Sequence, residues 1–369
     1  MSSTLEKALL LPTHLIPYGT TKELFAKVQN LFRSYVSLSE RQSALLAYWT
    51  FACWFPDILD FVPRLTVTGS RYAADLLFRV LRAVCRRPIL LASMSGAALR
   101  AIPIEELMPT LFIRQTDLNR RNRELLDASD RKGYLVANGK ELREAYCAKC
   151  IYIERDYGEQ PPISNGIHIH VARNVSLPDR SLPSPQDVEA LQNQMFRYRC
   201  YNRELVFASV FSPAGLTSDM ASVARPLGAA IVDDVELQQR VVELLAEQNE
   251  QARIDRATAR EGMVLRAVLS YCHQSDRQQV LAKEIAVTLN QMYRDEGEST
   301  KFSSESVGHV LKNIGLYTRR LGSSGRGLLL DKSTQASIHQ LSFHYDVPPK
   351  VPECGNCHKL QTAQSEGVM

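Results

Sequence analysis

Short apolar runs that alternate with helix-patterned segments constrain the fold of this chain more than any other feature. Each run is only a few residues long, and an amphipathic or polar stretch follows it. The runs are residues 65–68, 88–91, 111–113, 151–153 and 167–171. Strands that alternate with helices in this way form parallel sheets covered by helices. We therefore predict an α/β domain with a mostly parallel sheet.

The turn after the first run has the spacing of a phosphate-binding loop. A working loop reads G-x-x-x-x-G-K-[ST], in which backbone amides cradle phosphates, the lysine contacts them and the hydroxyl binds magnesium. Counted from Gly69, the second glycine is Ala74, the lysine is Asp75 and the hydroxyl residue is Leu76. A carboxylate at the lysine position repels the triphosphate that it should neutralise. We predict that this turn no longer binds nucleotide.

A second position that a nucleotide-hydrolysing enzyme needs is also replaced. Magnesium-dependent NTPases carry acidic residues at the end of a buried strand. The apolar run over residues 109–113 is instead followed by Arg114 and Gln115. Arginine cannot bind a cation, and glutamine is a poor base. Because both sites lack the residues that nucleotide hydrolysis needs, we expect no ATP turnover and no cofactor.

With these two altered motifs, residues 19–232 resemble the P-loop ATPase cores of helicase-like and primase-associated proteins carried by phages, plasmids and integrated elements. The specific matches are the Val-Thr-Gly-Ser turn, the Pro-Thr-Leu-Phe-Ile strand and a helix that opens at Asp117. The resemblance implies a P-loop NTPase-like fold, but it transfers no active-site role. The alternative is an ordinary α/β domain whose first turn happens to contain Thr-Gly-Ser.

Basic residues gather around the two altered motifs. Residues 64–132 contain 13 basic and 7 acidic side chains, whereas the whole chain has a net charge of only +4. Four arginines are expected on the outer side of the helix that follows the turn: Arg79, Arg82, Arg86 and Arg87. Three more follow the altered acidic motif: Arg120, Arg121 and Arg123. Such rows are usually solvated helix faces, and phosphate contact is the alternative.

Composition indicates several domains and no membrane span. The chain has 369 residues, of which 45% are hydrophobic, and it can bury more than one core. It has no apolar stretch of about 18 residues and no signal-peptide pattern, so we expect a cytoplasmic protein. The expected parts are a helical lead-in over 1–56, a degenerate P-loop ATPase-like domain with a helical lid over 57–232, a helical connector over 233–261, a winged-helix domain over 262–347 and a polar tail over 348–369.

The winged-helix prediction rests on the order of patterns within residues 262–347. Apolar residues at helical spacing predict two helices, and Ser303 caps a third helix that Gly315 ends. Two short β runs, 316–321 and 327–330, follow, and a glycine-tipped loop joins them. Three helices and a hairpin in this order are typical of a winged helix-turn-helix fold.

This segment resembles the winged-helix modules that end many mobile-element replication proteins, in which a serine-rich third helix is followed by a glycine and a basic wing. The resemblance implies binding to duplex DNA, with the third helix in the major groove and the wing on phosphates. The residues expected to face DNA are Ser304, Ser306, His309, Lys312, Arg319, Arg320 and Arg326. Docking of another protein is the alternative.

Two C-x-x-C pairs offer only incomplete metal sites. Cys147 and Cys150 lead into a predicted buried strand, where we expect them to pack as small hydrophobes. Cys354 and Cys357 on the polar tail supply half of the four ligands that a zinc site requires. The other two ligands would have to come from elsewhere, for example from the first pair or from a second subunit. We therefore treat Cys354 and Cys357 as weak candidates and predict no bound metal.

Together these patterns predict a non-catalytic DNA-binding accessory protein of replication or of a mobile element. Its pseudo-ATPase domain would act as a scaffold, and its winged helix would contact double-stranded DNA. Other replication or mobile-element proteins are expected partners, a homo-oligomer is left open, and no membrane is involved. Two alternatives are a divergent DNA-dependent ATPase or helicase, and a winged-helix transcriptional regulator whose large domain senses a ligand.

Overall fold

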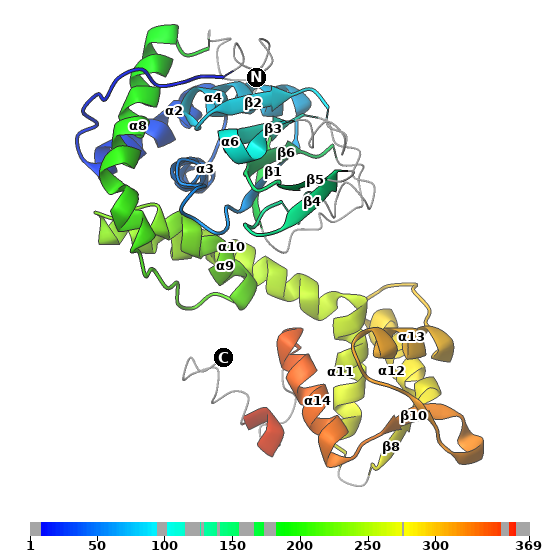
Figure 1. The fold of residues 1–369 in the computed structure, drawn as a ribbon. Helices are drawn as coiled ribbons and strands as arrows, with labels where there is room; N and C mark the ends of the chain where they lie inside the picture. The colour runs from blue at the N-terminus through cyan, green and yellow to red at the C-terminus, as the bar shows by residue number, and fades with distance from the viewer. Residues whose placement is uncertain are drawn as a thin grey trace. The chain divides into compact units, whose positions relative to one another are not determined.

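The computed structural model describes residues 9–93, 102–114, 126, 129–138, 141–154, 166–172, 182–274, 277–347 and 354–358. The chain divides into two compact units, residues 1–247 and 248–369, whose elements are labelled in Figure 1. Each unit has a hydrophobic core of its own. A helix with the length and apolar character needed to cross a bilayer does not occur among the described residues.

A parallel sheet forms the centre of the first unit. Over the described ranges its five strands lie in the order β2-β3-β6-β1-β7. The strands are β1 (Arg64–Gly69), β2 (Pro88–Leu91), β3 (Thr110–Ile113), β6 (Ala148–Tyr152) and β7 (Gly166–Val171). Each strand overlaps one of the five predicted runs, so the prediction of an α/β fold with a mostly parallel sheet is confirmed.

Side chains of these strands enter two cores, one on each face of the sheet. Leu65 and Val67 of β1 belong to the larger core, whereas Leu111 and Ile113 of β3 belong to a smaller core that includes residues of α6 (Ile104–Leu107). Successive strand residues point to opposite faces, and parallel sheets are commonly covered on both. The fully buried apolar runs seen in the sequence follow from this double burial.

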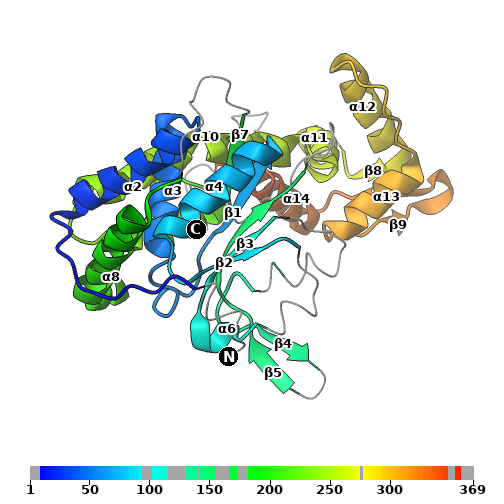
Figure 2. The same ribbon diagram turned by 90° about the horizontal axis from the view of Figure 1, so that it is seen from above.

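Helices cover the sheet and extend the larger core. They are α2 (Thr21–Tyr35), α3 (Glu40–Ala52), α4 (Arg71–Val84), α8 (Pro185–Phe207), α9 (Ser218–Ala229) and α10 (Val235–Thr258), the last of which continues into the second unit. α4 packs on β1, and α2 and α8 pack on α4 (Figure 2). Capping boxes begin α2 at Thr20 and α3 at Ser39.

Tryptophans of α3 and of the turn that follows it lie at the centre of the larger core. Trp49 and Trp54 are almost completely buried. Their indole N–H groups donate to the carbonyl oxygens of Pro63 at 2.7 Å and of Val84 at 2.9 Å. Buried and hydrogen-bonded rings cannot stack on nucleic-acid bases without unfolding the core. Trp49 and Trp54 are therefore part of the core and not a base-stacking surface.

An antiparallel hairpin that the sequence pattern did not predict lies outside the parallel sheet. It consists of β4 (Leu135–Asn138) and β5 (Glu141–Glu144), and β5 contacts α6 (Figure 2). Leu135 and Leu142 are 58% and 66% exposed, so the hairpin lacks the buried apolar face that makes a strand visible in a sequence.

The second unit combines helices with a small antiparallel sheet. In chain order its described elements are α11 (Arg260–Cys272), β8 (Gln279–Leu281), α12 (Ala282–Asp295), α13 (Ser304–Asn313), β9 (Arg319–Arg320), β10 (Arg326–Leu329) and α14 (Lys332–His344). β10 pairs with both β8 and β9. Apolar residues of all four helices meet in one core.

Parts of the predicted pattern for this unit need correction. The strand β8, which contains Val280, was not predicted. The paired hairpin strands are shorter than the predicted β runs, because Leu316 is 5% exposed and enters the core, and Gly322–Ser324 forms a 3-10 turn. α14 follows the hairpin and was not predicted at all.

α13 is built as its sequence predicts. The Ser303 hydroxyl accepts a hydrogen bond from the Ser306 N–H, which caps the helix. Val307 and Leu311 face the core and are fully buried. Gly315 has φ +84, a left-handed conformation that glycine adopts readily and that ends the helix. The predicted start and end of the third helix are thus confirmed.

Candidate functional sites

The turn between β1 and α4 is the sequence-predicted nucleotide loop. Only Ser70 separates Gly69, the last residue of β1, from Arg71, the first residue of α4. Gly69 has φ +101, and a Cβ at this position would lie 2.3 Å from the carbonyl oxygen of Val171. Glycine is therefore required for the close approach of β1 and β7. The Ser70 side chain caps α4 by accepting the Ala73 N–H.

Ala74, Asp75 and Leu76 lie inside α4 and not in an extended loop. The Ala74 N–H donates to the Ser70 carbonyl oxygen at 2.9 Å, so the helix already uses that amide. A phosphate cradle needs several backbone N–H groups that point at one anion. A single-residue turn followed at once by a regular helix is a poor cradle for a triphosphate.

The two altered motifs meet in space. Arg114 follows β3, and its Nη2 atom lies 2.6 Å from Oδ2 of Asp75 in α4. The Arg114 N–H donates to the Leu91 carbonyl oxygen at 2.9 Å, which fixes the backbone of Arg114 beside the end of β2. A cationic side chain therefore lies beside the turn that the sequence suggested as a nucleotide loop. Gln115, the other residue of the altered acidic motif, lies outside the described residues.

A hollow of about 270 Å³ opens beside this ion pair. Its lining residues are Asp75, Phe78, Arg79, Leu90, Leu91, Ala92, Phe112 and Arg114. The ion pair is neutral as a whole, and Arg79 adds one positive charge. Among the residues that line this hollow, Asp75 alone could ligate a cation, and it already pairs with Arg114. The lining therefore lacks the acidic pair on which a magnesium–nucleotide site depends.

Two of the arginines predicted on the outer face of α4 have structural roles instead. Arg86 and Arg87 come after the end of α4, and their guanidinium groups donate to the carbonyl oxygens of Met108 at 2.9 Å and Leu107 at 2.7 Å. Burial, helped by the nearby charges of Arg199 and Arg87, lowers the pKa of Arg86 to about 9. These two side chains are therefore poorly placed for phosphate contact. Arg120, Arg121 and Arg123 lie outside the described residues.

The outward face of α13 presents polar side chains to solvent. Ser304, His309 and Lys312 are exposed, as predicted. Ser306 is half-buried, and its hydroxyl donates to the Ser303 carbonyl oxygen at 2.8 Å while accepting the Ser303 N–H at 2.9 Å. Ser306 is thus engaged in the helix cap, which limits what it can offer to a ligand.

The hairpin that follows α13 concentrates positive charge. Arg319, Arg320 and Arg326 are exposed, and Arg320 lies directly opposite Arg326 in the β9–β10 ladder. The Arg326 guanidinium donates to the Thr318 carbonyl oxygen at 2.9 Å, which steadies the hairpin. Like charges directly opposite each other destabilise a strand pair unless a counter-ion reduces their repulsion. The hairpin is therefore suited to bind an anion.

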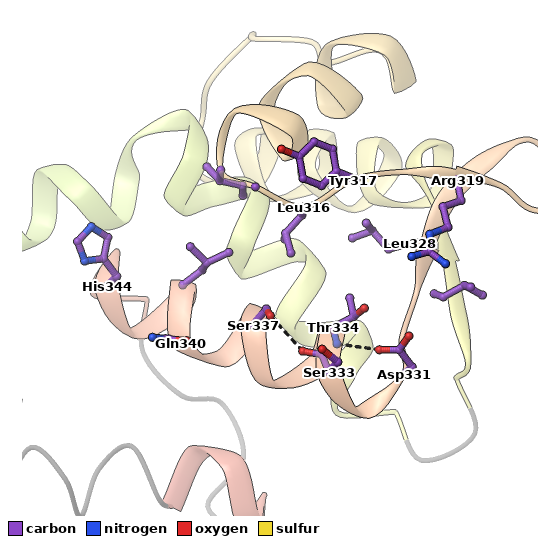
Figure 3. A pocket seen from close by; sticks show the side chains of 14 residues that line it. Leu316, Tyr317, Arg319, Leu328, Asp331, Ser333, Thr334, Ser337, Gln340 and His344 are labelled. Atoms are coloured by element: carbon purple, nitrogen blue, oxygen red, sulfur yellow. Dashed lines mark hydrogen bonds between the residues drawn. The ribbon is translucent and has the colours of Figure 1, made fainter.

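A cavity of about 560 Å³ lies between residues 314–319, β10 and α14 (Figure 3). Two of its polar side chains serve α14 itself. Asp331 caps this helix by accepting the Thr334 N–H at 2.8 Å, and the Ser337 hydroxyl donates to the Ser333 carbonyl oxygen at 3.1 Å. The lining shown in Figure 3 otherwise mixes apolar and polar groups, and we assign it no catalytic role.

The first C-x-x-C pair packs in the sheet, as predicted. Cys147 belongs to the smaller core and Cys150 to the larger one, so the two thiols face opposite sides of the sheet. Burial raises the pKa of the Cys147 thiol to about 11 and that of the Cys150 thiol well above its ordinary value. Because the two thiols face opposite sides of the sheet, they cannot bind one metal ion together.

The second pair lies beside two histidines that sequence reasoning missed. Ligand atoms of Cys354, Cys357, His273 and His339 all lie within 4.8 Å of one another. His273 precedes Cys357 by 84 residues, and His339 lies in the unpredicted helix α14. No local spacing links residues that are so far apart, so only the fold reveals the cluster.

Comparisons with known proteins give no family. No family model matches the chain, and a search of curated proteins finds no match. Among solved structures, the C-terminal region of NrS-1 is 13% identical, with 89% of this chain and 78% of that chain covered at a TM-score of 0.33. A Drosophila ORC structure bound to DNA is 11% identical, with 90% and 95% covered at a TM-score of 0.20. These likenesses are too loose to inform function, which we infer from the side chains.

Proposed function

We propose that this chain is a non-catalytic DNA-binding accessory protein of replication or of a mobile element, with a pseudo-ATPase scaffold and a winged helix that contacts duplex DNA. The element order of the second unit supports the winged-helix assignment. The helices α11, α12 and α13 precede the β9–β10 hairpin, and β8 closes the small sheet. In this fold family α13 is the recognition helix and the hairpin is the wing.

The facing arginines of the wing are the observation that carries the DNA assignment. Arg320 and Arg326 are exposed and cross-strand neighbours, and Arg319 precedes them on β9. Their mutual repulsion is relieved when each contacts a phosphate, because phosphate oxygens accept from guanidinium groups in charge-assisted hydrogen bonds. Duplex DNA offers such phosphates in a row, with one negative charge per about 1.7 Å of helix axis.

α13 supplies the groups that can read base edges. Ser304, His309 and Lys312 are exposed on this helix, and their hydroxyl, imidazole and ammonium groups can bond to acceptors in the major groove. The opposite side of α13 is fixed in the core by Val307 and Leu311, so the outward groups have a defined orientation. A rigidly held helix beside a basic hairpin fits a groove-and-phosphate contact better than an extended chain does.

The scaffold role of the first unit is supported by its internal ion pair. Asp75 and Arg114 neutralise each other at the altered nucleotide position, and Ser70 leaves no long loop for phosphates. The parallel sheet and its covering helices nevertheless form a large, well-packed core. The unit is well packed although it lacks the residues that nucleotide hydrolysis requires. Such a unit is suited to assembly with other proteins or with further copies of the chain.

Fluorescence anisotropy of labelled duplex DNA tests the proposal on the full-length protein. We expect Arg319→Ala/Arg320→Ala to weaken binding at least about tenfold, because two phosphate contacts are lost. The matched control, Arg33→Ala/Arg225→Ala, removes the same charge from exposed sites in the first unit and should leave affinity within about twofold. Equal affinities for wild type and the wing variant would overturn the assignment, whereas equal losses in both variants would indicate non-specific attraction.

A further inference from the structure

Four side chains with metal-binding atoms converge in the second unit. The Nε2 atoms of His273 and His339 are 3.2 Å apart. The Cys354 Sγ lies 3.3 Å from the His339 Nε2, and the Cys357 Sγ lies 3.3 Å from the His273 Nε2. In a tetrahedral zinc site, bonds of about 2.0–2.1 Å to nitrogen and about 2.3 Å to sulfur place ligand atoms about 3.3–3.8 Å apart. These three of the six separations fall close to this range, and all four ligand atoms lie within 4.8 Å of one another.

The four ligands come from separate parts of the unit. His273 immediately follows α11, His339 lies in α14, and both cysteines belong to the short segment 354–358. Local propensity does not explain why these side chains meet, because they come from three separate segments of the chain. A bound ion accounts for all four positions at once.

The surroundings also favour a metal. The His339 Nδ1 lies 2.7 Å from the Gln335 carbonyl oxygen and can donate to it, which leaves the Nε2 lone pair available to a cation. His339 and Cys357 are each only 4% exposed, whereas His273 and Cys354 are half-buried, so the site is partly shielded from solvent. Two thiolates and two imidazoles form a donor set that zinc prefers, and the absence of a carboxylate from this set argues against magnesium or calcium.

We propose that His273, His339, Cys354 and Cys357 bind one structural zinc ion, which fastens the tail segment 354–358 to α11 and α14. On binding, the two thiols release their protons to solvent, and the two thiolates neutralise the charge of Zn²⁺. Four protein ligands complete the tetrahedron, so the site holds no open position for substrate and has a structural role. Zinc thereby links the end of α11 and the middle of α14, and it stabilises the unit that carries α13 and the wing.

Metal analysis of the full-length protein, produced with zinc in the medium, gives the first test. We expect one zinc per chain, and we expect Cys354→Ser/Cys357→Ser to lose it. Cys200→Ser, an exposed thiol in the first unit, and His344→Gln, an exposed histidine of α14, are matched controls that should retain the full zinc content. Circular dichroism checks that every variant folds.

Cobalt substitution provides a second readout that needs no variant. Chelator-treated wild-type protein titrated with Co²⁺ should develop thiolate-to-cobalt charge transfer and the intense d–d bands of a tetrahedral site, saturating at one equivalent. Zinc should then displace the cobalt and raise the melting temperature by several degrees. Wild-type protein that contains no zinc and gives no tetrahedral cobalt spectrum would overturn the proposal, as would full zinc content in the double-cysteine variant. A thiol assay showing Cys354 and Cys357 joined in a disulfide in the folded protein would also overturn it.

Discussion

Asp75 and Arg114 form an ion pair with a 2.6 Å Nη2–Oδ2 distance, although 39 residues separate them in the chain. Each residue has the opposite charge to the one that a nucleotide-hydrolysing site requires at its position. In the proposed comparison with a P-loop, Asp75 stands at the lysine position and Arg114 at the acidic position. The two side chains have opposite charges and therefore attract each other.

The reversed pair predicts that ATP does not bind with micromolar affinity and is not hydrolysed. Asp75→Lys alone should not rescue hydrolysis, because the acidic pair that would hold magnesium is still absent, and a phosphate-release assay measures this. The same substitution should lower the free energy of unfolding by up to about 1 kcal/mol, since the pair is partly exposed. Isothermal titration calorimetry with Mg-ATP and a denaturant titration measure binding and stability.

A charge swap is the control for this prediction. Asp75→Arg/Arg114→Asp restores attraction between the two positions and should recover most of the stability that Asp75→Arg alone loses. Asp233→Arg makes the same charge change at an exposed site and should have little effect. Micromolar Mg-ATP affinity of the wild-type protein would contradict the pseudo-ATPase assignment.

The elements that could be predicted are those whose buried apolar residues recur at a regular spacing in the sequence. The strands β2 and β3 were predicted almost to the residue, because apolar runs bounded by polar segments are the direct signature of a doubly covered parallel sheet. The hairpin β4–β5 has no buried apolar face, and β8 is too short to show a period. Both were therefore invisible to a pattern analysis.

The functional sites were predicted only as single residues. Asp75 and Arg114 were each interpreted as unfavourable for nucleotide chemistry, but their pairing depends on α4 lying beside the end of β3. Cys354 and Cys357 were treated as weak candidates with no predicted metal, and the two histidines beside them become visible only when α11 and α14 converge. Contacts between distant parts of the chain are set by packing, and one sequence contains no direct record of them.

The cap of α13 predicts that both of its serines act on stability, whereas His309 acts on the preference among DNA sequences. Ser303→Ala removes the hydroxyl that accepts the Ser306 N–H and should destabilise the second unit by about 1 kcal/mol. Ser306→Ala should also act on stability, because its hydroxyl bonds to the backbone of Ser303. His309→Ala should change the preference among duplex sequences and leave stability within about 0.5 kcal/mol. Thermal unfolding and competition binding separate these outcomes. A Ser306→Ala protein with unchanged stability and altered sequence preference would show that Ser306 reads bases.

The start of α12 predicts a contribution to acid stability. The Leu281 N–H donates to the Glu284 carboxylate, and Arg277 pairs with it at 2.9 Å; in this order these contacts lower the pKa of Glu284 below its ordinary value of 4.5. A carboxyl group whose pKa is lowered by folding stabilises the protein above its unfolded-state pKa, and this contribution is lost as pH falls through the folded-state pKa.

Glu284→Gln should therefore reduce stability at neutral pH and flatten its decrease below about pH 4.5. Denaturant titrations at a series of pH values measure this difference. Glu298→Gln, at an exposed position after α12, is the control and should keep the wild-type slope. Parallel acid limbs for wild type and Glu284→Gln would mean that the carboxylate contacts contribute nothing.

The central claim is that the wing binds duplex DNA through its phosphates. The salt dependence of duplex binding tests this claim most directly. The logarithm of the association constant falls linearly with the logarithm of salt concentration, by about 0.9 for each phosphate neutralised. Arg319→Ala/Arg320→Ala should therefore reduce the magnitude of the slope by nearly 2, roughly 0.9 for each arginine, and by similar amounts on unrelated sequences. An unchanged slope in this folded variant would contradict the account, because the wing arginines would then make no phosphate contact.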